Sequence, residues 1–519
     1  MLQIISIVRN FIKNRIIEMY VLISLCILLI VVIKPFSTDY FCKNIYLLPN
    51  FPLLIIGLVT VFILLVGKKV RVNVFQGIKQ SSCLLKFIFG ILFIQGVICY
   101  NIQFLTNWDV DALLNNAKWI ADGKYDNLNN LYFSNYPNNI LLLSIFSLIY
   151  KFLNLIGIDS FVKGVRFLVL VQCILSVGTL CLLYRLVLDI TKSYFIAFLN
   201  GGIYFVFIGL SPWLVITYTD SMGLIFPILI LFAYHKCNDK NVLMSTFVIC
   251  LLTYFGYKIK PQVAFVSIAI IVIETLFLNF NFQMSNYLNK QIKVICTCIF
   301  AIVLCNFIYS SYVVPSTHLK LNRDAEFGVA HYLMLGHDYT RGGVYSGRDV
   351  QFSREIPNRE LRTKENIRVF CERVKFLGFA GLTEFYIKKT LTNFNDGTFA
   401  WGHEGNFYST IFKNKNEHLS PFLRNIFYNN GKYFIYWSSF MQMIWLTILF
   451  FNGCIIFAKE FAEKNKTLLV AIVSIIGLII FETLFEARAR YLYTYVPIYI
   501  LLATIGCKYF IKRLAYLFK

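Results

Sequence analysis

The sequence predicts an all-α polytopic membrane protein with about 12 transmembrane helices, together with interfacial helices and an extracytoplasmic mixed loop domain. The chain has 519 residues, of which 58% are hydrophobic and 15% are charged, whereas soluble domains carry about 25% charged residues. Apolar runs of the roughly 17–25 residues that a helix needs to cross a bilayer recur along it. A water-soluble core cannot bury this much apolar surface, so burial in a membrane is the remaining solution.

Twelve apolar runs have the length and composition of a membrane-spanning helix. They lie at 19–34, 51–67, 84–104, 166–188, 194–211, 221–235, 242–257, 262–280, 292–314, 431–457, 467–484 and 490–508. Lys and Arg gather at the N-terminus, in the loops near 68–71, 185–192, 235–240 and 459–464, and in the C-terminal tail. One orientation places all of these on the inner side, as the positive-inside rule requires.

A shorter apolar segment at 139–155 does not fit this orientation as a full span. Counting it as a crossing would break the positive-inside pattern downstream. It is therefore predicted to be a re-entrant or interfacial helix on the outer side.

The predicted organisation has three parts. An N-terminal transmembrane module covers 1–314 and includes a first external loop at 105–165. An extracytoplasmic loop domain follows at 315–430, and a C-terminal transmembrane module covers 431–519.

The net charge of +22 does not indicate a nucleic-acid-binding protein, because the basic residues lie in short segments between apolar runs. The 14 cysteines lie mostly inside apolar runs and show neither a disulfide framework nor a zinc-site spacing. Membrane lipids are the expected general partners, and nucleic acid is not expected.

Two pairs of basic residues lie on the predicted outer side, where the usual charge bias predicts few. Lys258 and Lys260 lie between two apolar runs, and Arg488 and Arg490 precede the last one. Ionisable groups at membrane depth are costly and most often functional, and lipid phosphates lie at that depth. These four cations are therefore candidate donor-phosphate-binding residues.

Acidic residues also lie where spans meet the outer side. Asp109 and Asp111 follow the third span, and Asp220 follows the fifth. A carboxylate there can accept the proton of a sugar hydroxyl. With the outer cations, these acids suit displacement of a sugar from a lipid phosphate, because one group activates the acceptor while others hold the leaving phosphate. All three acids are candidate catalytic residues.

Each of these residues also has a structural interpretation. The acids at 109 and 220 alternatively cap helices, and Asp109-x-Asp111 alternatively binds a metal ion. The two lysines alternatively extend their amines to the headgroups. The two arginines alternatively form structural ion pairs with Glu482 and Glu486.

Short motifs in a fixed order carry a family resemblance. They are Trp108-Asp-Val-Asp111, Tyr132-Phe-Ser-Asn-Tyr-Pro-Asn-Asn139, Tyr218-Thr-Asp220, Lys258-Ile-Lys-Pro261 and Glu486-Ala-Arg-Ala-Arg-Tyr-Leu492. In this order the chain resembles the glycosyltransferase-C superfamily, in particular bacterial relatives of the protein O-mannosyltransferase and aminoarabinose-transferase group.

The resemblance implies a polyprenyl-phosphate monosaccharide donor, an external active site and an inverting single displacement. It implies that Asp109 is the general base, with Asp111 as the nearby alternative. It implies that Asp220 positions the acceptor or shares the acid–base work. The chain departs from the family pattern in having Asp-Val-Asp, where an Asp-Glu or Glu pair is frequent.

The expected function is a membrane glycosyltransferase that moves a sugar from a polyprenyl-phosphate donor to a glycan, glycolipid or protein acceptor of the cell envelope. The reaction is expected at the outer face of a bacterial plasma membrane. Glu486, Tyr136 and Asn138 are the expected supporting residues. No cofactor is required, because the lipid already activates the sugar, although a divalent cation is an alternative. The rival functions are a polysaccharide polymerase or ligase that uses lipid-diphosphate donors, and a lipid or solute flippase-transporter.

Overall fold

The computed structural model describes residues 2–33, 46–66, 81–238, 240–277, 284–403 and 407–517. Within them helices predominate, and β1 (Phe104–Leu105) pairs antiparallel with β2 (Thr410–Ile411) in a two-stranded sheet. The predicted all-α class is therefore confirmed. The basic loop predicted at 68–71, like the outermost residues of the spans predicted at 19–34, 51–67 and 262–280, lies outside the described residues.

The helices of the first half of the chain include most of the apolar runs. They are α1 (Leu2–Ile33), α2 (Asn50–Val66), α4 (Ser81–Ile102), α5 (Asp109–Ala121), α6 (Asn130–Asn135), α7 (Ile140–Leu155), α8 (Phe161–Thr191), α9 (Tyr194–Tyr204), α10 (Thr219–Gly223), α11 (Ile225–His235), α12 (Val242–Ile259) and α13 (Ala264–Leu276). Two of them, α7 and α13, begin directly after a 3-10 turn led by proline, at Pro137–Asn139 and Pro261–Val263, because proline lacks the N–H that a first helical turn leaves unpaired.

The helices of the second half enclose a more polar segment. They are α14 (Met284–Ile308), α15 (Val314–Ser316), α16 (Val329–Leu335), α17 (Gly347–Glu355), α18 (Arg359–Phe394), α19 (Leu419–Phe427), α20 (Phe434–Gly453), α21 (Lys459–Glu463), α22 (Lys466–Leu484) and α23 (Val496–Leu517). A 3-10 segment at Ala489–Tyr495 connects α22 to α23.

Eight helices among the described residues are long and apolar enough to cross a membrane. They lie at Arg15–Ile33, Pro137–Leu155, Phe161–Thr191, Val242–Ile259, Lys290–Ser316, Phe434–Glu463, Lys466–Leu484 and Ala489–Leu517. Shorter apolar helices lie at Asn50–Leu64, Lys86–Ile102, Tyr194–Gly209, Thr219–His235 and Pro261–Leu276, and every predicted span coincides with a stretch of one kind or the other. Large apolar side chains remain uncovered on them, such as Phe93, which is 72% exposed, as expected where lipid is the solvent.

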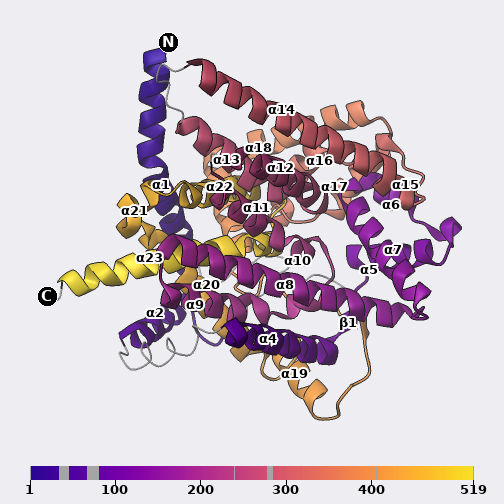
Figure 1. Cartoon of the computed structure of the whole chain (residues 1–519). Coiled ribbons are helices and arrows are strands. Elements are labelled where there is room, and N and C mark those ends of the chain that lie inside the picture. The colour runs from indigo at the N-terminus through magenta and orange to yellow at the C-terminus, as the bar shows by residue number, and fades with distance from the viewer. Residues whose placement is uncertain are drawn as a thin grey trace.

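The long helices form a bundle with two distinct ends. In Figure 1, α4, α8 and α23 run roughly from left to right, with α21 and the C-terminus on the left and α5, α6 and α7 on the right. We call the end with α5 and α7 the site end, and we call the end with α21 the opposite end.

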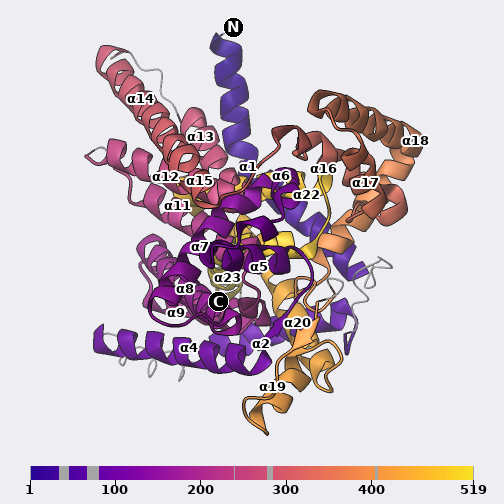
Figure 2. The same ribbon diagram turned by 90° about the vertical axis from the view of Figure 1, so that its right-hand side faces the viewer.

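α7 is the apolar segment for which the sequence predicts an interfacial or re-entrant helix, yet its length and composition also suit a span. It lies alongside α5 in both views (Figures 1 and 2). Asn139 Nδ2, just before α7, donates to the Tyr132 hydroxyl at 2.7 Å. Near its other end, Asn154 Nδ2 donates to Asp122 Oδ1 at 3.1 Å. α7 is thus tied to α6 at its start and to the residue that follows α5 near its end.

The chain returns to the site end before α8 begins its passage through the bundle. Arg166 Nε, in the first turns of α8, donates to Gln103 Oε1 at 3.2 Å. Gln103 directly follows α4. The segment between these two residues, which holds α5, α6 and α7, therefore starts and finishes at the same level of the bundle.

A small lobe, residues 323–376, projects from the site end and comprises α16, α17 and the first half of α18 (Figure 2). Arg362, 3% exposed, holds it together by donating to five backbone carbonyls. The acceptors are Asp324, Glu326, Ser353, Ile356 and Pro357. α18 kinks after the lobe at Gly378, whose φ of 58° lies in the left-handed region that suits glycine.

Candidate functional site

Asp109 is the first residue of α5 and its carboxylate accepts two phenol hydrogen bonds. Tyr132 donates to Oδ1 and Tyr218 donates to Oδ2, each at 2.9 Å. Trp108 occupies the N-cap position, so the helix-capping interpretation of Asp109 is wrong. Burial, followed by the Asp109 charge, raises the pKa of both phenols, which keeps them neutral donors. Each carboxylate oxygen retains a further lone pair for another donor.

Asp220 lies in α10 and is 2% exposed. It forms a buried ion pair with Lys260, and its Oδ2 lies 4.0 Å from Arg490 Nε. The N-cap of α10 is Tyr218, so the capping interpretation of Asp220 is also wrong. Burial lowers the pKa of Lys260, and the Asp220 carboxylate opposes that effect. The headgroup interpretation does not hold for Lys260, because its amine is directed into the protein.

Arg490 connects the two acidic positions. Its guanidinium carbon lies 4.5 Å from the centre of the Trp108 ring and 5.7 Å from that of Tyr218. Tyr218 carries the hydroxyl that donates to Asp109. Within the group Asp220, Lys260 and Arg490, two cations face one anion. This group therefore has one positive charge in excess, and such an excess favours a bound anion.

Glu486 and Arg488 form the ion pair that the structural interpretation anticipates. Arg488 Nε donates to Glu486 Oε1 at 2.7 Å, and the Tyr491 hydroxyl donates to Oε2 at 2.9 Å. Burial alone would raise the pKa of Glu486, but Arg488, Arg490 and these hydrogen bonds hold it below its usual range. Arg490 additionally lies beside a second carboxylate, with its Nε 4.0 Å from Asp220 Oδ2.

Asp111 is directed away from the Asp109 carboxylate. Its Oδ1 accepts from Asn115 Nδ2 at 2.8 Å, one turn further along α5, and partial burial raises its pKa. Among the described residues, no three His, Cys, Asp or Glu side chains lie close enough together to hold a metal ion. The Asp-Val-Asp motif therefore has no third protein ligand of these types in the part of the chain described.

Lys258 and Asn138 also lie apart from the group around Asp220. The Lys258 amine lies 4.4 Å from the centre of the Tyr309 ring. Asn138 Nδ2 donates to its neighbour Asn139 at 3.2 Å. Tyr136 is closer to the site, because its ring packs 5.2 Å from that of Tyr132.

Three residues at or next to the site, Tyr132, Tyr218 and Lys389, were not singled out from the sequence, and a fourth, Glu482, was given an arginine partner. Tyr132 and Tyr218 lie in the quoted motifs, and a tyrosine near each acid was the signal that could have found them. Lys389 gave no such signal, because its Nζ bonds only backbone carbonyls, those of Gly336 and Phe485. Glu482 was predicted as an arginine partner, but among the described residues its buried carboxylate has no hydrogen-bond partner.

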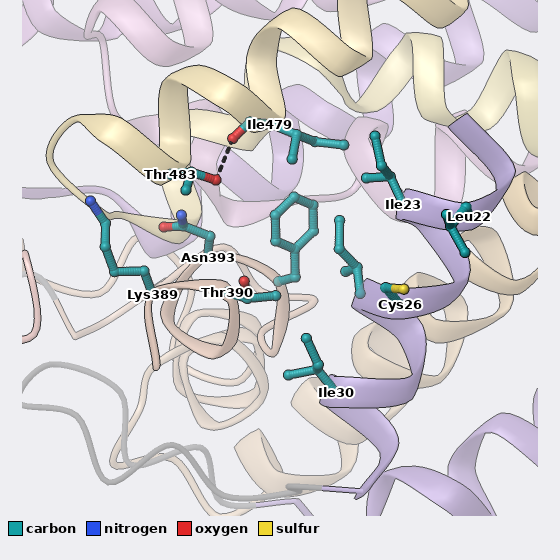
Figure 3. Close-up of a pocket in the computed structure, with 11 residues that line it drawn as sticks. Leu22, Ile23, Cys26, Ile30, Lys389, Thr390, Asn393, Ile479 and Thr483 are labelled. Atoms are coloured by element: carbon teal, nitrogen blue, oxygen red, sulfur yellow. Dashed lines mark hydrogen bonds between the residues drawn. The ribbon is translucent and has the colours of Figure 1, made fainter. Parts of the chain in front are cut away.

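A pocket of about 300 Å³ lies between α1, α18 and α22 (Figure 3). Its lining residues are mainly apolar on α1 and more polar on α18. They are Leu22, Ile23, Cys26, Ile27, Ile30, Lys389, Thr390, Asn393, Phe394, Ile479 and Thr483. Lys389 reaches from its rim to the carbonyl of Phe485, which directly precedes Glu486.

Comparison with known proteins gives one family. The family model described as "Conserved hypothetical integral membrane protein" matches residues 8–510, nearly the whole chain. No curated protein and no solved structure matches the chain.

Proposed function

From the premise that the chain belongs to this family of integral membrane proteins, we propose that it is a membrane glycosyltransferase. It transfers a sugar from a polyprenyl-phosphate donor to an acceptor of the bacterial cell envelope, with inversion at the anomeric carbon. One observation carries the proposal: the hydrogen-bonded carboxylate of Asp109 is connected through Tyr218 and Arg490 to the buried cations around Asp220.

Asp109 is the general base of the proposed reaction. Its carboxylate is oriented by two neutral phenols and retains lone pairs for an acceptor hydroxyl. Asp220 suits this role less well, because it is 2% exposed and paired with Lys260. Asp220 instead holds Lys260 and Arg490 in place. The proposal therefore assigns the base to Asp109 and a positioning role to Asp220.

The reaction is a single displacement. Asp109 takes the proton of the acceptor hydroxyl as its oxygen forms a bond to the anomeric carbon. The bond between that carbon and the phosphate oxygen breaks, and its electron pair stays on the phosphate. The leaving polyprenyl phosphate gains one negative charge, which Lys260, Arg488 and Arg490 stabilise. The displaced proton remains on Asp109 until solvent removes it.

The pocket between α1, α18 and α22, about 300 Å³ in volume, is the proposed place for the first part of the donor's lipid tail. Two of its three walls come from candidate membrane spans, so its natural filling is hydrocarbon. Its rim residue Lys389 contacts the backbone just before Glu486. A tail in this pocket thus leads toward the segment that carries Arg488 and Arg490.

The proposed topology has twelve crossings with α7 lying at the interface. Because Arg166 bonds Gln103, the chain between them makes an even number of crossings, and α7 is the only candidate span there in the described residues. An interfacial α7 leaves the acids and cations on one side, which the positive-inside pattern assigns to the outside.

Replacement of the base tests the proposal. Mass spectrometry of cell-envelope glycans should show a sugar that disappears when the gene is deleted, returns with the wild-type protein and does not return with Asp109→Asn. General-base loss is expected to slow transfer by about 10²–10⁴-fold. Asp111→Asn is the matched control, because its carboxylate bonds Asn115 instead. Full activity of Asp109→Asn would eliminate Asp109 as the base.

A donor assay separates the proposed reaction from the rival functions. Purified protein is offered matched short-chain polyprenyl monophosphate and diphosphate sugars, and release of the lipid phosphate is measured. The proposal predicts turnover of the monophosphate donor. Turnover of the diphosphate donor alone indicates a polymerase or ligase. Movement of lipid across a vesicle membrane without a covalent product indicates a flippase.

A further inference from the structure

We propose that Lys389 is a positioning residue that fixes the backbone of Phe485 against the lobe and so holds Arg488 and Arg490 in place for the donor phosphate. The inference rests on the proposed transfer from a lipid phosphate, and it adds a residue from α18 to that site. Lys389 is 1% exposed. In the part of the chain that the structure describes, its amine hydrogen-bonds to backbone carbonyls and not to Asp109 or Asp220. Lys389 therefore acts on the site through the backbone.

The amine of Lys389 joins two segments that are far apart in the sequence. Nζ donates to the carbonyl of Gly336, at the end of α16, at 2.7 Å. It also donates to the carbonyl of Phe485, just after α22, at 2.5 Å. Burial lowers the pKa of Lys389 to about 7, but the amine keeps an N–H for each of the two carbonyls whether or not it carries the extra proton. Lys389 therefore couples the lobe to the start of the segment that carries the arginines.

The two segments are also in direct contact. Ala487 N donates to the carbonyl of Gly343 at 2.8 Å, which adds a backbone bond between them. A Cβ at Gly336 would lie 2.4 Å from the carbonyl carbon of Phe485. A Cβ at Gly343 would lie 2.7 Å from the Gly336 oxygen. The close approach of the two segments thus requires glycine at position 336, while glycine at position 343 is required by the packing within the lobe and against Lys389.

This junction ends next to the proposed phosphate-binding residues. Ala487 lies between Glu486 and Arg488, and the Arg488 guanidinium carbon lies 5.9 Å from the centre of the Tyr345 ring, which belongs to the lobe. A shift of the backbone at Phe485 is therefore carried directly to the arginine side chains. The expected consequence of breaking the junction is weaker donor binding together with a slower chemical step, because the two arginines hold the donor phosphate and also stabilise the charge that develops on it.

Two independent variants break the junction in the full-length protein. Lys389→Met removes both hydrogen bonds and keeps an unbranched side chain of similar length. Gly336→Ala forces the two backbones apart. Lys388→Met is the matched control for the first, since Lys388 is about half exposed and pairs with Glu384 on the same helix. Gly347→Ala is the control for the second, because a Cβ there meets nothing within 4 Å.

Steady-state kinetics in lipid vesicles with a short-chain polyprenyl-phosphate sugar give the first readout. Both junction variants should lower kcat/KM for the donor at least about tenfold, the effect of about 1.4 kcal/mol of lost interaction. The acceptor KM should change little, and both controls should match the wild type. A donor kcat/KM unchanged in both variants would overturn the proposal, as would an equal change in donor and acceptor KM.

Hydrogen exchange at the Ala487 amide gives a readout that needs no substrate. The amide donates to Gly343 across the junction, so it should exchange at least about tenfold faster in Lys389→Met than in Lys388→Met. Unchanged exchange would show that Lys389 does not hold the segment. If the wild-type protein transfers no sugar while exchange still rises, the proposed function fails and the junction stands.

Discussion

The two ends of the helical bundle use charged residues in opposite ways. At the opposite end, ion pairs connect the turns between helices and remain open to solvent. Lys466 pairs with Glu274 at 2.8 Å, with side chains 43% and 45% exposed. At the site end, Lys260 and Asp220 pair with side chains only 4% and 2% exposed. The contrast lies in burial rather than in the type of residue.

This difference separates charges that set topology from charges that build a site. Exposed pairs contribute about 0–1 kcal/mol and are screened by salt. Buried ions carry a desolvation cost of several kcal/mol each, which a site repays only through close partners or a bound ligand. The site end carries this cost repeatedly, at Lys260, Asp220 and Arg490. We infer that function, rather than stability, explains their burial.

Removal of one cation at each end should give the largest difference between the two ends, measured as the loss in the free energy of unfolding. Lys260→Met removes the nearest cation partner of the buried Asp220, leaves Arg490 Nε at 4.0 Å, and should lower the free energy of unfolding by about 3–5 kcal/mol. Lys466→Met leaves Glu274 in contact with solvent and should cost at most about 1 kcal/mol. Thermal unfolding of both variants in the same lipid or detergent measures the contrast. Equal losses at the two ends would remove the distinction.

Acidification should loosen the lobe before the bundle. Burial lowers the pKa of His331 and of His337 to about 4, so both are neutral in the folded lobe. Below pH 6.5 the two histidines become protonated in the unfolded chain, so the unfolded state binds more protons than the folded state. Stability of the lobe therefore falls as pH drops from 6.5 toward 4, by about 2 kcal/mol per histidine between pH 6.5 and 5.

Hydrogen exchange at pH 7.5, 6 and 5, corrected for intrinsic rates, measures this loss. Protection of α16 and α17 should fall while that of α8 and α23 is kept. His331→Gln should reduce the pH dependence. A lobe equally protected at pH 7.5 and 5 would contradict the assigned protonation states.

Removal of a single phenol hydroxyl at each end should give the smallest difference, measured as the rate of sugar transfer. Tyr218→Phe removes one of the two hydrogen bonds that orient Asp109 and should slow transfer by about tenfold, the effect of one hydrogen bond to a charged group. Tyr234→Phe removes an equivalent bond to Glu274 at the opposite end and should leave transfer unchanged. Initial rates with the same donor compare the two. A greater loss in Tyr234→Phe would reverse the assignment.

The sequence predicted the helices well, because a bilayer imposes a narrow range of lengths on apolar runs. It also predicted that acids and cations gather at one end, through departures from the positive-inside rule. It did not distinguish the roles of charged residues that lie two positions apart in the sequence. Asp109 and Asp111 lie two residues apart at the start of one helix, so their side chains take different faces. Lys258 lies on α12, whereas Lys260 follows its end in extended backbone.

Contacts made through the backbone were beyond prediction for a different reason. Lys389 bonds two backbone carbonyls, and every residue of the chain carries a carbonyl of this kind. Only the close approach of Gly336 to Phe485 selects these acceptors. A lysine in the middle of a long helix therefore carries no signal of its role until the tertiary structure is known.

Labelling of single cysteines from one side of the membrane tests most directly whether the buried charges face the outside. The native cysteines are replaced by serine, and Tyr345→Cys or Lys124→Cys, both near the site end, is compared with Lys466→Cys at the opposite end. Intact cells are treated with a membrane-impermeant maleimide. The account predicts that the first two react in intact cells and that Lys466→Cys reacts only after permeabilisation. Reaction of Lys466→Cys from outside, or labelling of Tyr345→Cys and Lys124→Cys from different sides, would contradict it.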